Sequence, residues 1–392
     1  MLTSNSSFGH LPTELLQAIA SRLPAEDLCS FRLSCKSIYV NTMYIFGCTF
    51  FKRIETNLSL KGLERVGAIA NNSELAPHVC SLTVKYVARP EDKLGEGLTW
   101  NRHSSGYLLP DADVQKWAGV LRGLVNCTSF HLIRQGWSDK DTCLDHFTST
   151  DIITLILNGI IEAHIPVKEF LVDFIPELLG GANELDLRRL NMPDLCKPEF
   201  IAVWANLQVL LLNFTMEKIG IADWIDPIVR HATDLRKLTI LFDNGWAARG
   251  LIERLSSLDT TSQLQELTLK GVTKSKINEA SLSKLLHNYR DSLRVLNITW
   301  ITLESSGWKS ILQMLSKFPL LESFSFNTLR EARCDIQFPV ASEIPAVDKG
   351  TEFTFRPRKR KDRMFNTRVS CRGPNTKAII QRLADSMEIV WR

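Results

Sequence analysis

The sequence predicts an α/β protein in which a small three-helix module at the N-terminus is followed by a solenoid of strand and helix repeats. Two observations predict this fold class. A short apolar pattern recurs at nearly constant spacing through the second half of the chain, with helical periodicity between its copies. The first fifty residues lack that pattern and carry closely spaced apolar residues interrupted by two prolines, which is typical of short helices. We therefore expect a module at 1–50, repeats at 51–330, and a linker, a basic segment and a C-terminal cap or tail at 331–392.

The bulk composition is that of a globular protein with more than one unit. The chain has 392 residues, of which 44% are hydrophobic and 23% charged, and its net charge of +4 is too small to indicate a nucleic-acid partner. The nine cysteines form no CxxC pair, so we expect reduced thiols and no metal site. Neither a secretory leader nor an apolar run of about 18 residues is visible. We expect the cytoplasm, the nucleus or both as the location, and no membrane partner.

Three helices are expected in the opening module. Pro12 stands at an early helical position, where its missing N–H costs nothing, and this helix runs to about Arg22. Pro24 ends that helix and begins the second, and Ser34 is the expected cap of a third helix through Ile45. On periodicity alone, these helices are either a separate module or the first layer of the next domain. Because so few residues rarely enclose a stable core, we expect them to need a partner surface.

The order of residues in this stretch favours a separate module. It contains LPTELLQAIASRL, then DL, then RLSCK. This order resembles the F-box, the three-helix module of substrate receptors in Skp–cullin–F-box (SCF) ubiquitin ligases, although Tyr39 stands where many members have a tryptophan. The resemblance implies a Skp-type adaptor as the partner and, through it, a cullin. The adaptor-binding residues that it implies are Leu11, Pro12, Leu15, Leu16, Ile19, Leu23, Leu28, Leu33 and Cys35.

The repeated pattern has an apolar residue, two intervening positions, a second apolar residue, one position and a third. Its middle residues are Leu185, Leu210, Leu238, Leu267, Leu296 and Phe324, at steps of 25, 28, 29, 29 and 28 residues. Alternation at the end of each copy predicts a short strand, and less regular copies lie near Leu82, Phe130 and Phe170. The helices expected between strands have their apolar anchors at Val203, Ile228, Leu255, Leu285 and Leu315.

This spacing resembles leucine-rich repeats, which commonly follow F-boxes in the same receptors. The asparagine usual in that family is replaced in each copy, so we expect degenerate repeats. The residues at its position are Thr215, Asp243, Val272, Ile301 and Leu329.

Two insertions in the early repeats are candidates for contact with a target protein. The first, Ala88–Pro110, holds Trp100 and Tyr107, and the second, His131–Phe147, holds Arg134 and Trp137. Aromatic residues together with arginine are typical of interface hot spots. The alternative is that these are loops whose aromatic rings fold back on the repeats.

A basic segment lies near the C-terminus. It has three interpretations, which are a nuclear-import segment, a patch for phosphate-bearing partners and a solvated loop, and we expect an exposed loop or tail. The stretch 331–350 before it resembles a linker, 376–387 is expected to be helical, and the last residues to form a cap. The basic residues are Arg356, Arg358, Lys359, Arg360, Lys361 and Arg363.

The sequence shows no spacing typical of catalysis. It has no HExxH, GxSxG, P-loop or GxGxxG motif, so we expect neither an enzyme nor a cofactor. The resemblance to F-box receptors implies the substrate-recognition subunit of an SCF-type ubiquitin ligase, which binds an unknown target protein. Two alternatives remain, which are an interaction scaffold in a Skp-containing assembly that is not a ligase, and an α/β enzyme with an unrecognised site.

Overall fold

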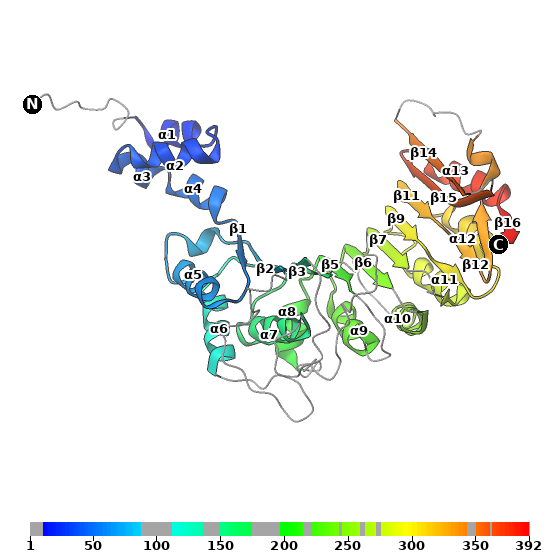
Figure 1. Ribbon diagram of the computed structural model, residues 1–392, viewed down its shortest axis with the longest axis horizontal. Coiled ribbons are helices and arrows are strands. Elements are labelled where there is room, and N and C mark those ends of the chain that lie inside the picture. Colours follow the sequence, from blue (N-terminus) through cyan, green and yellow to red (C-terminus); the bar gives the residue numbers. More distant parts are fainter. Residues whose placement is uncertain are drawn as a thin grey trace, which may run out of the picture.

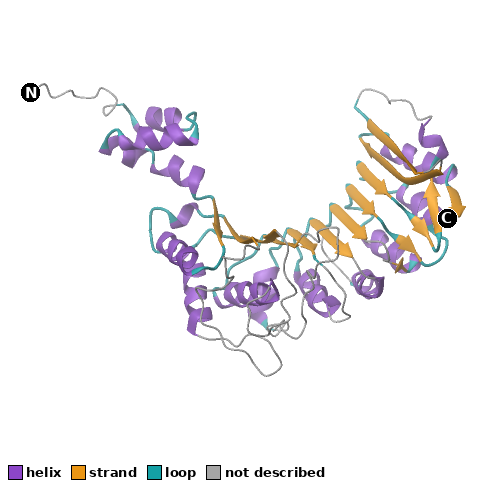
Figure 2. Cartoon of the chain, viewed as in Figure 1, coloured by secondary structure: helices purple, strands orange, loops and turns teal. Residues whose placement is uncertain are grey.

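The computed structural model describes residues 11–87, 112–135, 149–174, 197–214, 221–242, 245–258, 263–271, 276–342, 350–360 and 363–391. Figure 1 shows a small helical module at the N-terminal end, followed by a long curved sheet. Strands line the inner side of the curve and helices its outer side, as Figure 2 shows. The chain is therefore a mixed α/β protein with a helical N-terminal region.

The helical module differs in detail from the sequence prediction. Pro12 is the residue before the first helix rather than part of it, and Ser34 ends the second helix, where its Oγ donates to the Phe31 carbonyl at 2.7 Å. The third predicted helix is two short helices, divided at Thr42, whose hydroxyl bonds back to the Ile38 carbonyl at 2.6 Å. Such back-bonding competes with the helical ladder and bends it. The four helices are α1 (Thr13–Ala20), α2 (Ala25–Leu33), α3 (Lys36–Asn41) and α4 (Met43–Phe50).

Among the described residues, the main sheet has eleven strands in the order β1-β2-β3-β4-β5-β6-β7-β9-β11-β15-β14. The first nine are parallel, and the last two close the sheet as an antiparallel hairpin. Their bounds are β1 (Arg53–Thr56), β2 (Ser81–Val87), β3 (Ser129–Gln135), β4 (Glu169–Phe174), β5 (Val209–Asn213), β6 (Lys237–Phe242), β7 (Glu266–Gly271), β9 (Val295–Thr299), β11 (Ser323–Asn327), β15 (Arg363–Arg372) and β14 (Glu352–Arg360).

Helices connect these strands across the outer side of the sheet, as expected for parallel strands, which need a crossover. They are α5 (Leu60–Ala70), α6 (Ala112–Gly123), α7 (Ser149–Glu162), α8 (Pro198–Trp204), α9 (Ile221–His231), α10 (Gly245–Ser257), α11 (Glu279–Asn288) and α12 (Trp308–Leu315), with the short η2 (Ala76–His78) before β2. The predicted helix anchors Val203, Ile228, Leu255, Leu285 and Leu315 are all buried. The prediction that these five residues anchor the helices is confirmed.

The middle residues of the repeated pattern form one row across the sheet. Each pairs with the next in register, and each is at most 1% exposed. The expected strand around Leu185 lies outside the described residues, and because β4 pairs directly with β5, the sheet has no strand between them. The row consists of Leu82, Phe130, Phe170, Leu210, Leu238, Leu267, Leu296 and Phe324.

Apolar side chains occupy the positions where an asparagine would be expected in the last repeats. Ile301 and Leu329 are buried, and the residues before them, Trp300 and Thr328, both have φ of 55°. The Trp300 N–H donates to the Asn327 carbonyl at 2.8 Å, which links the two turns. Packing and backbone bonds therefore join these turns in place of an asparagine ladder. The other three positions, Thr215, Asp243 and Val272, lie outside the described residues.

The C-terminal part is folded onto the repeats, so the expected linker at 331–350 is wrong for residues 331–342. These residues form the end of β12 (Arg330–Glu331), then β13 (Cys334–Gln337) and η3 (Pro339–Ser342). The strands belong to a second sheet, in which β13 pairs with β16 (Glu388–Trp391), β12 with β10 (Thr302–Leu303), and β10 with β8 (Lys276–Ile277). The predicted C-terminal helix is α13 (Thr376–Asp385).

The basic segment is not the loop or tail expected from the sequence. Arg356, Arg358, Lys359 and Arg360 lie in β14, and Arg363 begins β15, while Lys361 lies outside the described residues. Because β15 pairs with β11, this hairpin extends the main sheet, and no domain boundary falls at residue 330. Alternating apolar residues such as Phe353 and Phe355, which pack against the core, explain why the segment is a strand. Its role in nuclear import stays a prediction.

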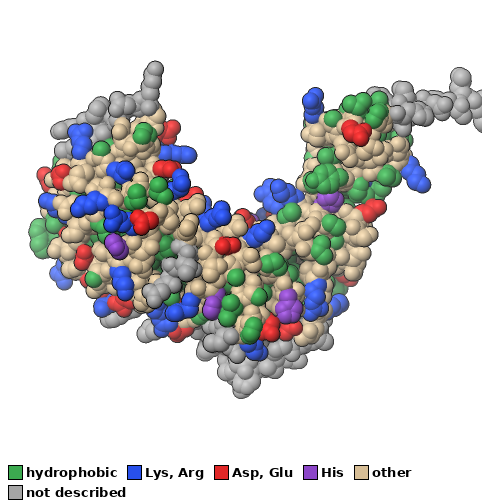
Figure 3. Space-filling model, turned by 180° about the vertical axis from the view of Figure 1, so that it is seen from behind, with side chains coloured by type: hydrophobic (Ala, Val, Ile, Leu, Met, Phe, Trp, Pro, Cys, Tyr) green, Lys and Arg blue, Asp and Glu red, His purple; other side chains and the backbone are tan. Residues whose placement is uncertain are grey.

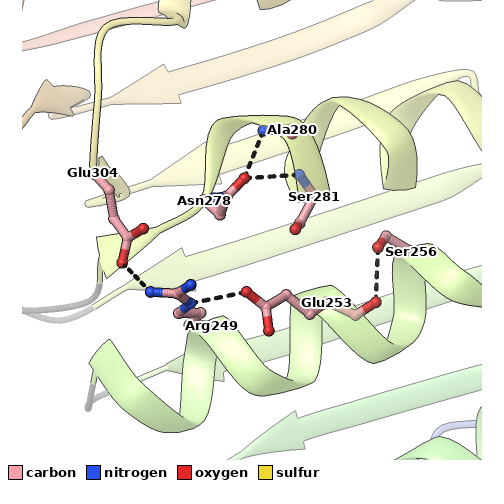
Figure 4. Close-up of polar contacts among 7 residues, drawn as sticks. All are labelled: Arg249, Glu253, Ser256, Asn278, Ala280, Ser281 and Glu304. Carbon is pink, nitrogen blue, oxygen red and sulfur yellow. Dashed lines mark hydrogen bonds and ion pairs between the residues drawn. The ribbon is translucent and has the colours of Figure 1, made fainter.

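Polar contacts stabilise α10 and the start of α11 (Figure 4). Arg249 on α10 donates to Glu253 at 2.8 Å and to Glu304 at 3.1 Å, and these two carboxylates raise its pKa. Asn278 caps α11 by accepting from the Ala280 and Ser281 amides. Such polar contacts favour one relative arrangement of the packed elements, which the apolar core alone does not specify.

Replacing Leu296 by alanine should lower the free energy of unfolding by about 2–5 kcal/mol, because it leaves a cavity in the buried row. The neighbouring Val295 faces the opposite side of the sheet and is half-buried, so Val295→Ala should cost less than about 1 kcal/mol. Urea unfolding followed by circular dichroism measures both. Equal costs for the two variants would contradict the assigned facing of β9.

Candidate protein-interaction surface

Exposed apolar side chains concentrate on the N-terminal helical module. Five of the twelve large exposed apolar residues among the described residues lie within its helices, although it is a small part of the chain. Monomeric proteins expose such residues singly, and a concentration of them indicates an interaction surface. The five are Leu15 at 51% exposure, Leu33 at 84%, Tyr39 at 46%, Val40 at 59% and Tyr44 at 61%.

The nine residues expected to bind an adaptor fall into three groups. Pro12, Leu15 and Leu33 are exposed, so a partner reaches them directly. Leu16 and Leu28 are buried at 0% and 1% exposure and form the module's own core, beneath the surface rather than on it. Four others are half-buried, namely Leu11, Ile19, Leu23 and Cys35.

Val40 and Tyr44 are exposed residues that the resemblance to the F-box did not include. Their exposure depends on how the four helices pack, which no local sequence pattern indicates. The first helix is tied to this region, because Thr13 donates to the Asn41 side chain at 3.1 Å and Gln17 to the Asn41 carbonyl at 3.3 Å. The exposed residues of α1 and of α3 therefore belong to one tightly connected unit.

Arg32 organises the module from inside. It is only 4% exposed, and its guanidinium carbon lies 4.3 Å from the centre of the Tyr39 ring and 4.0 Å from that of Phe46. It also donates to the Thr42 hydroxyl at 3.4 Å, and no carboxylate among the described residues pairs with it. A cation between two aromatic faces is attracted to both. Arg32 thereby joins α2, α3 and α4 and holds the exposed Tyr39 ring in place.

The module is joined to the sheet through α4 and η2. At Gly47 the two elements approach so closely that a β-carbon would lie 2.1 Å from the ring of His78. Cys48 Sγ lies 3.7 Å from His78 Nδ1, and the Tyr44 ring meets the same imidazole edge-on at 5.4 Å. A hydrogen bond with Cys48 raises the pKa of Tyr44 above its ordinary value. The joint is therefore a packed contact rather than a free linker.

The inner face of the main sheet is a second candidate surface. Side chains that alternate with the buried rows are half-buried or exposed here, and Figure 3 shows the hollow between the module and the far end of the sheet. Several are paired with one another, as in Lys237 with Glu266 at 2.7 Å and Ser129 with Glu169 at 2.9 Å. The face is open and carries mostly polar side chains, together with a half-buried apolar group formed by Leu171, Val209 and Leu211 on β4 and β5.

The four residues expected to contact a target are not brought together by the structure as described. Trp100, Tyr107 and Trp137 lie outside the described residues, so their part in binding stays a prediction. The second insertion does not begin at His131, because residues 131–135 belong to β3, which places the backbone of Arg134 within the sheet. The alternation of FHLIR, a strand pattern, was the signal for this.

Within the part of the chain that the structure describes, no group of three His, Cys, Asp or Glu side chains is arranged to hold a metal ion. The seven cysteines of this part are free thiols, and burial raises the pKa of Cys127 to about 12, which makes that thiol unreactive. No described helix combines the length and apolarity that crossing a membrane requires.

Comparison with known proteins identifies the module. Residues 8–43 match the F-box-like family model, which covers α1 to α3 and ends where α4 begins. No curated protein matches the chain. The chain therefore carries an F-box-like domain at its N-terminal end, on the helices that expose the apolar residues described above.

Replacing Gly47 by valine should separate α4 from η2, because its side chain cannot fit against His78. We expect faster trypsin cleavage at the exposed Lys52 and Arg53, which follow the joint. Gly250→Ala is the matched control, since a β-carbon there meets no atom within 4 Å, and it should leave cleavage unchanged. Cleavage of the valine variant at the native rate would show that the joint is not packed.

Proposed function

We propose that this chain is the substrate-recognition subunit of an SCF-type ubiquitin ligase. In this proposal the F-box-like domain at residues 8–43 binds a Skp-type adaptor, and through it a cullin, while the sheet domain holds a target protein. The observation that carries it is the coincidence of the family match with exposed apolar residues on the same helices.

The exposed apolar residues support adaptor binding on physical grounds. Leu15, Val40 and Tyr44 are each more than half exposed, which costs free energy in water and is recovered when a partner covers them. The module's own core is small, and it is completed by Arg32 between two aromatic rings rather than by further apolar residues. A partner that covers Tyr39 also shields the Arg32 guanidinium and the two rings beside it from water. Cation–π attraction is stronger when the groups are desolvated.

The second part of the proposal concerns the sheet domain, which we interpret as a solenoid of degenerate leucine-rich repeats. Its repeat period of 28 or 29 residues in the last copies, its parallel strands in register and its outer helices support this interpretation. Curved repeat domains offer their inner face to partners. The packed joint at Gly47 then holds that face in a fixed direction relative to the adaptor, which a ligase requires to present its target.

The proposed role is positional and does not involve bond-making by this chain. We propose accordingly that it is not an enzyme and needs no cofactor, and that it acts in the cytoplasm or the nucleus, where the ubiquitin system operates. The scaffold alternative differs only in whether a cullin joins the adaptor. Its test is therefore part of the same experiment.

The test is capture of a purified Skp-type adaptor by the full chain. Leu15→Asp and Val40→Asp should each weaken capture by about 100-fold, because a carboxylate in an apolar contact loses its hydration. Leu60→Asp and Val125→Asp are matched controls, since these residues are 58% and 69% exposed outside the module, and should bind normally. Undiminished capture by both module variants would refute the adaptor surface.

A second arm adds a cullin to the captured complex. Co-capture of the cullin, followed by transfer of ubiquitin to a protein bound by the sheet domain, is the result that a ligase subunit requires. Capture of the adaptor with no cullin would instead assign the chain to a Skp-containing assembly that is not a ligase.

A further inference from the structure

The hairpin of β14 and β15 accounts for the net positive charge of this protein. Residues 350–372 contain eight Lys or Arg and two acidic residues, Glu352 and Asp362. The whole chain has 47 basic and 43 acidic residues, so the remainder has 39 against 41 and a net charge of −2. The charge is therefore a local property of one element, at the far end of the sheet from the module (Figure 1).

Two pairs of arginines stand directly opposite each other in this hairpin. Arg356 pairs in register with Arg368, and Arg360 with Arg363. Like charges placed opposite across antiparallel strands are destabilising. At the base of the hairpin the pairing is complementary, because Glu352 stands opposite Arg372. Arg356 and Arg368 are both exposed, and their juxtaposition is a repulsion that folding alone does not require.

Protection of the sheet edge does not explain these charges. Edge strands often carry basic residues and proline to prevent further pairing, and β14 has Pro357 beside a shift in register. Arg368, however, lies on β15, which is paired on one side with β11 and on the other with β14. An internal strand has no free edge to protect, so this arginine has another use.

The basic residues continue a row across the inner face of the sheet. In register, Arg356 is followed by Arg368, Asn327, Thr299 and Lys270 on successive strands. The three basic members are exposed, and none makes an ion pair with a carboxylate of the described residues. Lys237 on the same face is instead paired with Glu266.

We propose that this row, from Arg356 to Lys270, docks an extended acidic segment of the target protein, one rich in Asp and Glu. The inference rests on the proposed function, in which the inner face holds a target. Five strands at about 4.8 Å spacing span about 19 Å, which some six residues of extended chain cover. Asn327 and Thr299 lie between the cations and supply hydrogen-bond partners for the peptide backbone.

Charge complementarity favours an acidic protein segment over a nucleic acid. The exposed cations Arg356, Arg368 and Lys270 lie in one line across the sheet. A single acidic peptide strand matches one line of charge, whereas a duplex has a dense, continuous charge that needs a wider basic surface. Pro357 and the register shift hinder a peptide from pairing with β14 as an additional strand. The basic side chains of the row therefore recognise the peptide, rather than the backbone of β14.

The experiment uses the full chain in complex with its adaptor and a fluorescent twelve-residue peptide of alternating Glu and Ser. Fluorescence anisotropy should show binding that weakens as salt is added. The double variant Arg356→Glu/Arg368→Glu should bind about tenfold more weakly or worse, because both charge-assisted contacts are reversed. A milder Arg356→Gln/Arg368→Gln variant should show an intermediate loss and guards against misfolding, which thermal unfolding checks.

The matched control is Arg290→Glu/Lys309→Glu, which makes the same change in net charge at exposed positions away from the row. It should bind within about twofold of the native chain. Equal weakening in this control, absence of peptide binding, or tighter binding of a DNA duplex through the same two arginines would each overturn the proposal. Capture of the adaptor by these variants is measured separately. Loss of adaptor capture would count against the proposed function, whereas loss of peptide binding alone tests the docking of an acidic segment.

Discussion

The constraint on which the structure depends is the register of one buried row of apolar side chains across the main sheet. Leu82 through Phe324 face the helices, so the residues between them must face the opposite side, because side chains in a strand alternate. A shift of one residue would expose the core and bury Lys237 and Lys270. The row therefore determines where the helices pack, which face stays open, and where the cations of the last strands lie.

The helical module solves a different problem, since so few residues cannot bury much apolar surface. Its core is Leu16, Leu28 and Ile38, supplemented by an arginine between two rings, and five large apolar side chains are left exposed on its helices. Gly47 allows α4 to contact His78, so these helices and the inner face of the sheet keep a fixed relation.

Period and alternation made the strands predictable, because apolar positions in them such as Leu238 and Leu267 are dictated by burial. The resemblance placed the module, and the family match agrees with it. Local sequence did not reveal the break at Thr42, which depends on a back-bonded hydroxyl, nor the exposure of Val40 and Tyr44, which depends on how four helices pack. The basic segment was misjudged as a loop because its charges hid the alternation of Phe353 and Phe355.

The central claim is that the helical module is the adaptor surface and that the sheet stays free when the adaptor binds. Hydrogen exchange of the full chain, with and without a Skp-type adaptor, tests it most directly. The account predicts slower exchange confined to α1–α4, with unchanged exchange in β5–β15. Protection in the sheet strands, or none in the module, would contradict it.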